Sequence, residues 1–155
     1  MTLTLQHEIK QSRPFASAEQ EATLSIERTA AVLMHAFGDT VREFGITGTQ
    51  YNVLRILRGA GDAGLCRTEI RDRLVAQVPD VTRLLDRLEK EGLITRDRDT
   101  DDRRFVLTRI TREGLSLLKR LDPVVEEAHE RQLGHLSRAQ LRSLIHLLSL
   151  VREGA

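Results

Sequence analysis

Basic and acidic side chains alternate over residues 81–104, VTRLLDRLEKEGLITRDRDTDDRR, in a pattern that suits contact with a nucleic acid. Four apolar residues of the first half recur at the spacing of one helical face: Val81, Leu84, Leu85 and Leu88. The polar residues between them lie on the opposite face and its flanks, and they are Thr82, Arg83, Asp86, Arg87 and Lys90. Because arginine forks onto guanine or a phosphate, this helix is a candidate to enter a DNA major groove.

Local signals predict where this helix begins and ends. Pro79 suits a first helical position, because its fixed φ matches and its missing N–H would have no partner there. Val78 cannot cap with its side chain, so we expect a helix over residues 78–91 with an imperfect start. Gly92 is placed to end it in a left-handed conformation. Taken alone, this pattern is more typical of an ordinary amphipathic helix whose charges are solvated or paired.

A charged hairpin follows the helix directly and changes that interpretation. Residues 93–95 and 105–108 have the composition of strands, and Asp, Thr and Asp at positions 99–101 favour a tight turn between them. Four arginines crowd the base and sides of the turn: Arg96, Arg98, Arg103 and Arg104. Taken alone, such a charged turn is typical of a solvated hairpin tip. Beside a groove-facing helix it is typical of the wing of a winged-helix DNA reader, with Asp102 holding an arginine in place.

Three further segments begin with the same helix-start signal, in which Ser or Thr is followed three residues later by Gln. The pairs are Ser17 with Gln20, Thr47 with Gln50, and Ser137 with Gln140, and each can form a capping box. The sequence predicts helices over residues 18–42, 48–57 and 67–75, the last forming a helix-turn-helix with residues 78–91. Two more helices are expected after Thr111 and Ser137.

These motifs together resemble the signature of the MarR family (multiple-antibiotic-resistance regulators), which are dimeric winged-helix transcription factors. The order and lengths of the predicted elements resemble the family over nearly the whole chain, whereas the specific motifs cover a smaller part of it. They are Val81-Thr82-Arg83, Leu88-Glu89 to Gly92-Leu93, Asp102-Arg103-Arg104, and Ile110-Thr111 to Gly114.

The resemblance implies a mainly α fold with a small β-hairpin wing, and a homodimer formed by the terminal helices. We therefore expect a polar N-terminal arm over residues 1–16, dimerisation helices over 17–44 and 111–155, and a winged helix-turn-helix lobe over 45–110. The last helix supports a partner, because Leu147 and Leu150 lie off its main apolar stripe. An intramolecular bundle is the alternative use of the same surface.

The family further implies a transcriptional repressor that reads an inverted repeat in double-stranded DNA. Such regulators are often released by a small aromatic or phenolic effector bound between the dimer helices and the reading lobe. His35, Phe37 and Tyr51 lie on elements that can line such a pocket, although ordinary packing explains each of them as well.

The charge balance gives DNA binding little support. The net charge is +1, and residues 67–104 contain ten Arg and Lys against ten Asp and Glu. The interpretation therefore rests on where the charges lie. A winged-helix module that binds protein and not DNA is the competing function.

Other chemistry finds weaker signals. Cys66 precedes a short helix, whose positive N-terminal end favours a reactive thiolate. Cys66 is therefore either a redox-sensing residue or a cysteine without a functional role. The five histidines have no zinc-ligand spacing, and no catalytic or phosphate-loop motif occurs, so we expect no metal, no cofactor and no enzyme activity. The single cysteine, the polar N-terminal residues and the lack of a long apolar run predict a cytoplasmic protein with no membrane partner.

Overall fold

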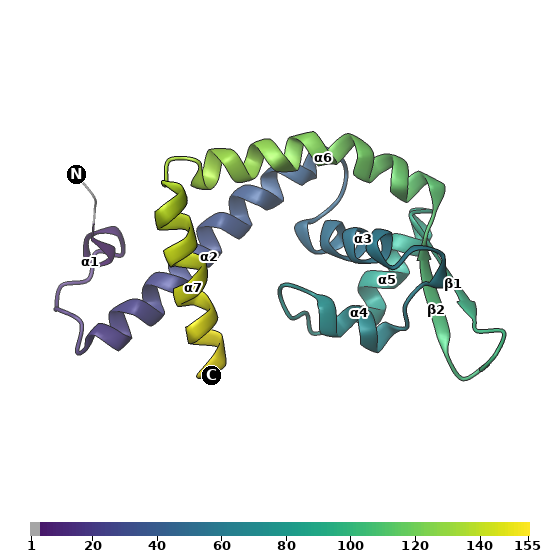
Figure 1. Ribbon diagram of the computed structural model, residues 1–155, viewed down its shortest axis with the longest axis horizontal. Helices are drawn as coiled ribbons and strands as arrows, with labels where there is room; N and C mark the ends of the chain where they lie inside the picture. The colour runs from purple at the N-terminus through teal and green to yellow at the C-terminus, as the bar shows by residue number, and fades with distance from the viewer. Residues whose placement is uncertain (1–3) are drawn as a thin grey trace.

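The structure, a computed structural model, describes residues 4–155 as a chain of helices interrupted by one hairpin (Figure 1). The elements are α1 (Leu5–Glu8), α2 (Ala18–Arg42), α3 (Gly48–Ala60), the 3-10 helix η1 (Gly61–Ala63), α4 (Arg67–Arg73), α5 (Val81–Lys90), β1 (Ile94–Arg98), β2 (Val106–Ile110), α6 (Arg112–Leu133) and α7 (Arg138–Glu153). This order confirms the predicted mainly α fold with a hairpin wing.

The elements form two regions joined by the long helix α6. In Figure 1, α3, α4, α5 and the hairpin form a lobe at one end, whereas α2 and α7 extend at the other. Helix α6 contacts both α2 and α3. Arg58 of α3 donates to both carboxylate oxygens of Asp122 in α6, at 3.0 and 2.9 Å, and the two regions are therefore linked by a charged contact as well as by apolar packing.

One apolar core holds the lobe together. Its fully buried large side chains come from α3, α4, α5, β1 and α6: Leu54, Leu57, Ile70, Leu85, Leu88, Ile94, Leu118 and Leu121. Burying a leucine or isoleucine stabilises a fold by about 1.5–3 kcal/mol relative to leaving it exposed. Because α5 and the hairpin both contribute to this core, their relative placement is fixed by packing.

The helix starts follow the capping signals with one exception. Complete capping boxes form at Thr47 and Ser137. The Ser17 hydroxyl accepts the Gln20 N–H, but the Gln20 side chain accepts from Ala16 N–H and not from Ser17.

The predicted start of α5 at Pro79 was wrong. Helix α5 begins at Val81, and the Asp80 carboxylate accepts the Arg83 N–H at 2.9 Å. Asp80 has non-helical backbone angles and its carboxylate caps the helix, so Pro79 lies before the cap and not in the first turn. Gly92 does end the segment with a φ of 75°, as predicted.

The strands lie later in the sequence than predicted. Antiparallel pairing runs from Ile94 opposite Ile110 to Arg98 opposite Val106, so Arg96 and Arg98 belong to β1 and not to the turn. Phe105 precedes β2 and is half exposed. Leu65 adds a short antiparallel bridge to Thr108, which ties the segment before α4 to the hairpin.

The N-terminal arm includes the short helix α1, where Leu5 is buried and Glu8 lies 4.0 Å from Arg28 of α2. Residues 1–3 of the predicted arm lie outside the described residues. Within residues 4–155, no helix combines the length and apolar character needed to span a membrane.

Apolar side chains remain exposed on the two terminal helices of the single chain. Helix α7 buries none of its residues, so it does not complete an intramolecular core. The exposed apolar residues of α2 and α7 include Val32, Met34, Leu144, Ile145, Leu147, Leu150 and Val151.

Gly114 at the start of α6 is required by a close approach of the backbone. A Cβ at this position would lie 2.5 Å from the Leu93 carbonyl oxygen and 2.6 Å from Ile110. We expect Gly114→Ala to lower the free energy of unfolding by about 1–3 kcal/mol, because the helix must move away from the hairpin. Urea denaturation measures this change.

Gly59→Ala is the matched control, because a Cβ there meets nothing within 4 Å and the residue lies within α3. It should stabilise the protein by about 0.4–1 kcal/mol through the unfolded chain. Equal unfolding midpoints for the two variants would contradict this account of Gly114.

Candidate nucleic-acid interface

Helix α5 presents one polar face to solvent. Its apolar face is buried through Val81, Leu85 and Leu88. All five side chains predicted on the other face are exposed: Thr82, Arg83, Asp86, Arg87 and Lys90. The helix is ten residues long, and its exposed face carries three cations. These are the dimensions and chemistry of a helix that enters a major groove.

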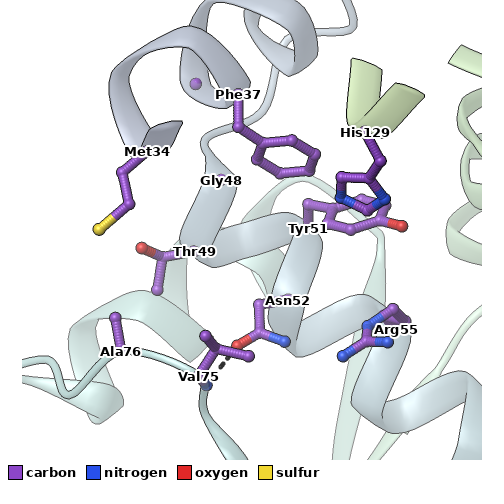
Figure 2. A pocket seen from close by; sticks show the side chains of 11 residues that line it. Met34, Phe37, Gly48, Thr49, Tyr51, Asn52, Arg55, Val75, Ala76 and His129 are labelled. Carbon is purple, nitrogen blue, oxygen red and sulfur yellow. Dashed lines mark hydrogen bonds between the residues drawn. The ribbon is translucent and has the colours of Figure 1, made fainter. Parts of the chain in front are cut away.

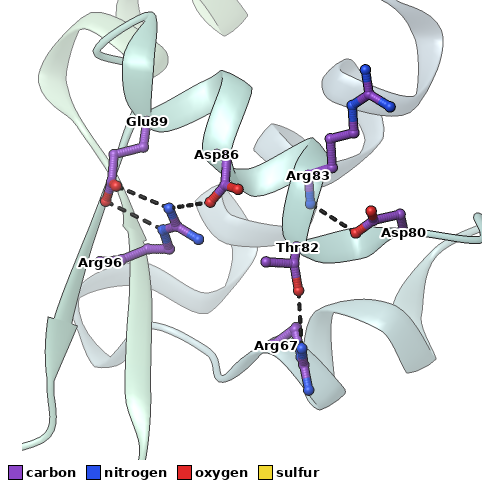
Figure 3. Close-up of polar contacts among 7 residues, drawn as sticks. All are labelled: Arg67, Asp80, Thr82, Arg83, Asp86, Glu89 and Arg96. Carbon is purple, nitrogen blue, oxygen red and sulfur yellow. Dashed lines mark hydrogen bonds and ion pairs between the residues drawn. The ribbon is translucent and has the colours of Figure 1, made fainter.

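Arg96 joins the wing to α5 (Figure 3). From β1, its guanidinium donates to Asp86 at 2.6 Å and to the two Glu89 carboxylate oxygens at 2.9 and 3.3 Å. Its side chain is 20% exposed, the least of any residue in an ion pair among the described residues. These hydrogen bonds raise the pKa of Arg96 and lower the pKa of Glu89. Three hydrogen bonds therefore fix Arg96 as a link between two elements, and they occupy the side chains of both Arg96 and Asp86.

The wing tip is closed by its own side chains. Arg104 and Asp102 form a two-pronged ion pair, whose hydrogen bonds lower the pKa of Asp102 and raise that of Arg104. Arg98 donates to the Arg103 carbonyl oxygen at 2.8 Å across the turn. The expectation that Asp102 holds an arginine is met by Arg104. The Arg103 side chain has no protein partner within residues 4–155, and the residue is exposed.

Sequence reasoning missed one residue beside the exposed face of α5. Arg67, the first residue of α4, donates to the Thr82 hydroxyl at 2.9 Å (Figure 3). This bond spans 15 residues between two helices, and neither helix alone signals it. It leaves the Thr82 hydroxyl proton available to donate to another group.

The hydrogen bonds and ion pairs of the charged side chains show where positive charge remains unpaired in the lobe. Seven of the ten acidic residues in residues 67–104 accept hydrogen bonds from the protein: Glu69, Asp72, Asp80, Asp86, Glu89, Asp99 and Asp102. In contrast, Arg83, Arg87, Lys90 and Arg103 have no ion-pair partner in the described chain. On the exposed face of α5 both acids, Asp86 and Glu89, are paired with Arg96, so this face presents more positive charge than the composition indicates.

Comparison with known proteins agrees with this arrangement. A sequence profile of the MarR family matches residues 46–106. The crystal structure of a MarR transcription factor from Planctomyces limnophilus is 42% identical, covers 88% of this chain and 99% of that one, and superposes with a TM-score of 0.67. A mutant MarR from Escherichia coli complexed with operator DNA is 25% identical over 83% of this chain and 91% of its own, with a TM-score of 0.76. The homoprotocatechuate degradative operon repressor of Escherichia coli is 26% identical over 81% of this chain and 84% of its own length.

The chain belongs to the MarR family. The predicted identity as a DNA-binding transcriptional regulator, and not an enzyme, is thereby confirmed.

In this MarR-family protein a cavity of about 410 Å³ opens between α2, α3, the turn after α4, and α6 (Figure 2). Phe37 packs edge-on against Tyr51 at 5.3 Å and stacks on His129 at 5.9 Å between ring centroids. Asn52 and Arg55 add polar groups to the wall. Burial raises the pKa of Tyr51 from its ordinary value of 10.0.

Two of the three residues predicted to line a pocket do so, and His35 does not. Phe37 and Tyr51 line the cavity. The His35 side chain is 79% exposed and lies 3.4 Å from Asp39. Residues two apart on a helix lie about 200° apart around its axis, so an inward Phe37 places His35 outward. His129 was missed as a lining residue, although it follows buried Val125 by four residues on the inward face of α6.

Cys66 occupies the cap position of α4 and is partly exposed. The Glu69 carboxylate accepts the Cys66 backbone N–H at 2.8 Å, so the local geometry is that of a helix start. In the described part of the chain, no group of three or more His, Cys, Asp and Glu side chains is arranged to hold a metal ion.

The bond between Arg96 and Glu89 predicts a pH dependence of stability. The folded-state pKa of Glu89 lies below its usual value of 4.5, so the ionised pair stabilises the folded protein above that pH. The contribution is lost as the pH falls through the lowered value. We therefore expect Glu89→Gln to lower the free energy of unfolding near neutral pH, with a difference from wild type that shrinks below pH 4.5.

Urea unfolding at a series of pH values measures this difference. Glu91→Gln serves as the control, because Glu91 is an exposed neighbour that forms no ion pair in the described residues. A difference between wild type and Glu89→Gln that does not change with pH would show that the pair does not contribute through ionisation.

Proposed function

We propose that this MarR-family regulator is a homodimeric repressor that binds an inverted-repeat operator and is released by a small aromatic or phenolic effector. The observation that carries the proposal is the exposed cationic face of α5, held in a fixed orientation beside a wing by Arg96. The Escherichia coli MarR complex with operator DNA supports it by structural similarity.

The recognition contacts divide into base-reading and backbone-positioning groups. Arg83 and Arg87 are proposed to read base edges, with Thr82 and Lys90 beside them on the same exposed face. Arg103 and Arg104 at the wing tip are proposed to reach the phosphate backbone or the minor groove. Arg98 closes the turn that carries them. Arg96 and Asp86 were expected to contact DNA, but their mutual hydrogen bond favours a supporting role for both.

A second copy of the chain is proposed to cover the exposed apolar faces of α2 and α7. The uncovered residues include Met34, Ile145 and Leu147, and a monomer would leave them in water. A twofold dimer places two copies of α5 on one face, so the half-sites should lie about one helical turn apart. Because it must reach the chromosome, the regulator is proposed to act in the cytoplasm.

The cavity is proposed as the effector site. Its aromatic wall of Phe37, Tyr51 and His129 suits a flat ring, and Arg55 suits a carboxylate or phenolate on that ring. The Escherichia coli relative named as repressor of a homoprotocatechuate degradative operon supports an aromatic effector class. Binding would lower DNA affinity by the difference between the effector's affinities for the two states.

Two alternatives make different predictions. The first alternative is a module that binds protein and not DNA, and the equal numbers of acidic and basic residues in the lobe support it. Such a module would show neither sequence-selective nor salt-dependent DNA binding. A thiol-based sensor would act through Cys66, in which case Cys66→Ser would remove the response of DNA binding to oxidant.

Selection from random duplex DNA tests the proposed function directly. We expect an enriched inverted repeat, and an affinity that falls steeply between about 50 and 200 mM salt because phosphate contacts release counterions. A folded dimer, free of bound ligand, that enriches no sequence would exclude the operator-binding proposal.

Arg83→Ala should weaken binding to the selected operator by about 1–3 kcal/mol and relax preference at one base pair, since the truncated side chain can no longer bind a base edge. Arg103→Ala should weaken binding to all DNA sequences alike. It should also reduce by about 1 the slope of log affinity against log salt concentration (the salt slope), as expected for a lost phosphate contact. Titrations at several salt concentrations measure both changes. The assignment of Arg83 is wrong if its loss changes the affinity for the operator and for unrelated DNA by the same small factor.

A further inference from the structure

The turn between α4 and α5 determines where the recognition helix begins. It comprises residues 74–80, and it is anchored at two points by the partly buried side chains of Leu74 and Val78. Between these anchors the backbone follows no regular structure. The position of Asp80, which caps α5, therefore depends on what holds this short segment in place.

One hydrogen bond holds the middle of the turn. The Val75 N–H donates to the side-chain oxygen of Asn52 in α3, at 2.9 Å (Figure 2). In the part of the chain that the structure describes, residues 75–79 make no other hydrogen bond to protein. The Val75 side chain is 84% exposed, so its burial contributes little to holding the segment. The Asn52 side-chain oxygen is therefore the main constraint on this part of the turn.

Asn52 also forms part of the cavity wall. It lies on α3 between Tyr51 and Arg55, and Val75 and Ala76 face the same space from the turn (Figure 2). Its side-chain NH2 group has no protein partner in residues 4–155, so it can donate to a bound molecule while the oxygen accepts from Val75. A single amide thus contacts both the cavity and the turn that leads into α5.

We propose that Asn52 is a positioning residue for DNA recognition, which holds the turn before α5 in its DNA-binding arrangement from the wall of the effector cavity. The proposal rests on the proposed function in that it takes α5 to be the DNA-reading helix. A molecule in the cavity that competes for the Asn52 amide changes the free energy of this arrangement. By linkage, DNA binding changes the affinity of the cavity by the same factor.

The test separates the hydrogen bond from the volume of the side chain. Asn52→Leu keeps nearly the same volume and removes the acceptor, whereas Asn52→Asp keeps an oxygen acceptor. Thr49→Val is the matched control, because Thr49 lines the same cavity from the same helix and its hydroxyl makes no hydrogen bond among the described residues. Two quantities are measured on the effector-free protein: amide hydrogen exchange at Val75, and affinity for the selected operator at several salt concentrations.

Asn52→Leu should expose the Val75 amide to rapid exchange and weaken operator binding about fivefold, the size expected from the loss of one neutral hydrogen bond. The salt slope should not change, because no phosphate contact is removed. Asn52→Asp should retain slow exchange at Val75, and Thr49→Val should match wild type in both measurements.

The proposal is overturned if Asn52→Leu keeps slow exchange at Val75, or binds the operator as tightly as Thr49→Val does. A reduced salt slope would also overturn it, because that result would make Asn52 a DNA contact. If the leucine variant does not fold, Asn52→Ala undergoes the same measurements. Failure of the wild-type protein to select any operator would instead refute the proposed function, while hydrogen exchange would still report whether Asn52 holds the turn.

Discussion

The lobe formed by α3, α4, α5 and the hairpin depends on one contact, the burial of the apolar face of α5 in the core formed with α3, α4 and α6. Val81, Leu85 and Leu88 form that face, and burying each such side chain stabilises the lobe by about 1.5–3 kcal/mol. A helix with three buried positions at this spacing has one orientation. The same burial therefore turns Arg83 and Arg87 to solvent and places Asp86 and Glu89 beside β1, where Arg96 meets them. Packing energy sets the geometry, and the polar contacts refine it.

The distribution of charge shows why a nearly neutral chain can belong to a DNA-binding family. Acidic side chains in the lobe cap helices or hold arginines in place, as Asp80 and Asp102 do. Among the described residues, the cations that form no ion pair include Arg83, Arg87 and Lys90 on α5 and Arg103 at the wing tip. Net charge adds every group equally, whereas a phosphate responds to the groups that face it within about a Debye length of 8–10 Å. The local field of the lobe is therefore a better guide to its partner than the total.

The proposed regulation through the cavity requires that the cavity, the terminal helices and α5 share elements. Helix α3 provides this connection, because it contributes Tyr51 and Asn52 to the cavity, Leu54 and Leu57 to the core, and Arg58 to the contact with α6. A change in the cavity wall is therefore a change in the support of the lobe. Packed interfaces of this kind shift between discrete arrangements, and a small displacement on one side can be passed to the other.

The sequence by itself determined the longer helices, the caps at Thr47, Thr111 and Ser137, the hairpin and the exposed face of α5, because these follow from local periodicity and capping chemistry. Tertiary structure decided the rest. Arg96 and Arg104 are both arginines in the same charged segment, but only the three-dimensional pairing makes one a partly buried link to Glu89 and the other an exposed partner of Asp102. His35 was predicted to line the cavity and does not, whereas His129, for which the sequence analysis predicted no role, does, because the lining of the cavity depends on how α2 and α6 pack. Local patterns fix which face of a helix is apolar, whereas contacts between residues distant in the chain, such as Arg67 with Thr82, arise only when the core brings the helices together.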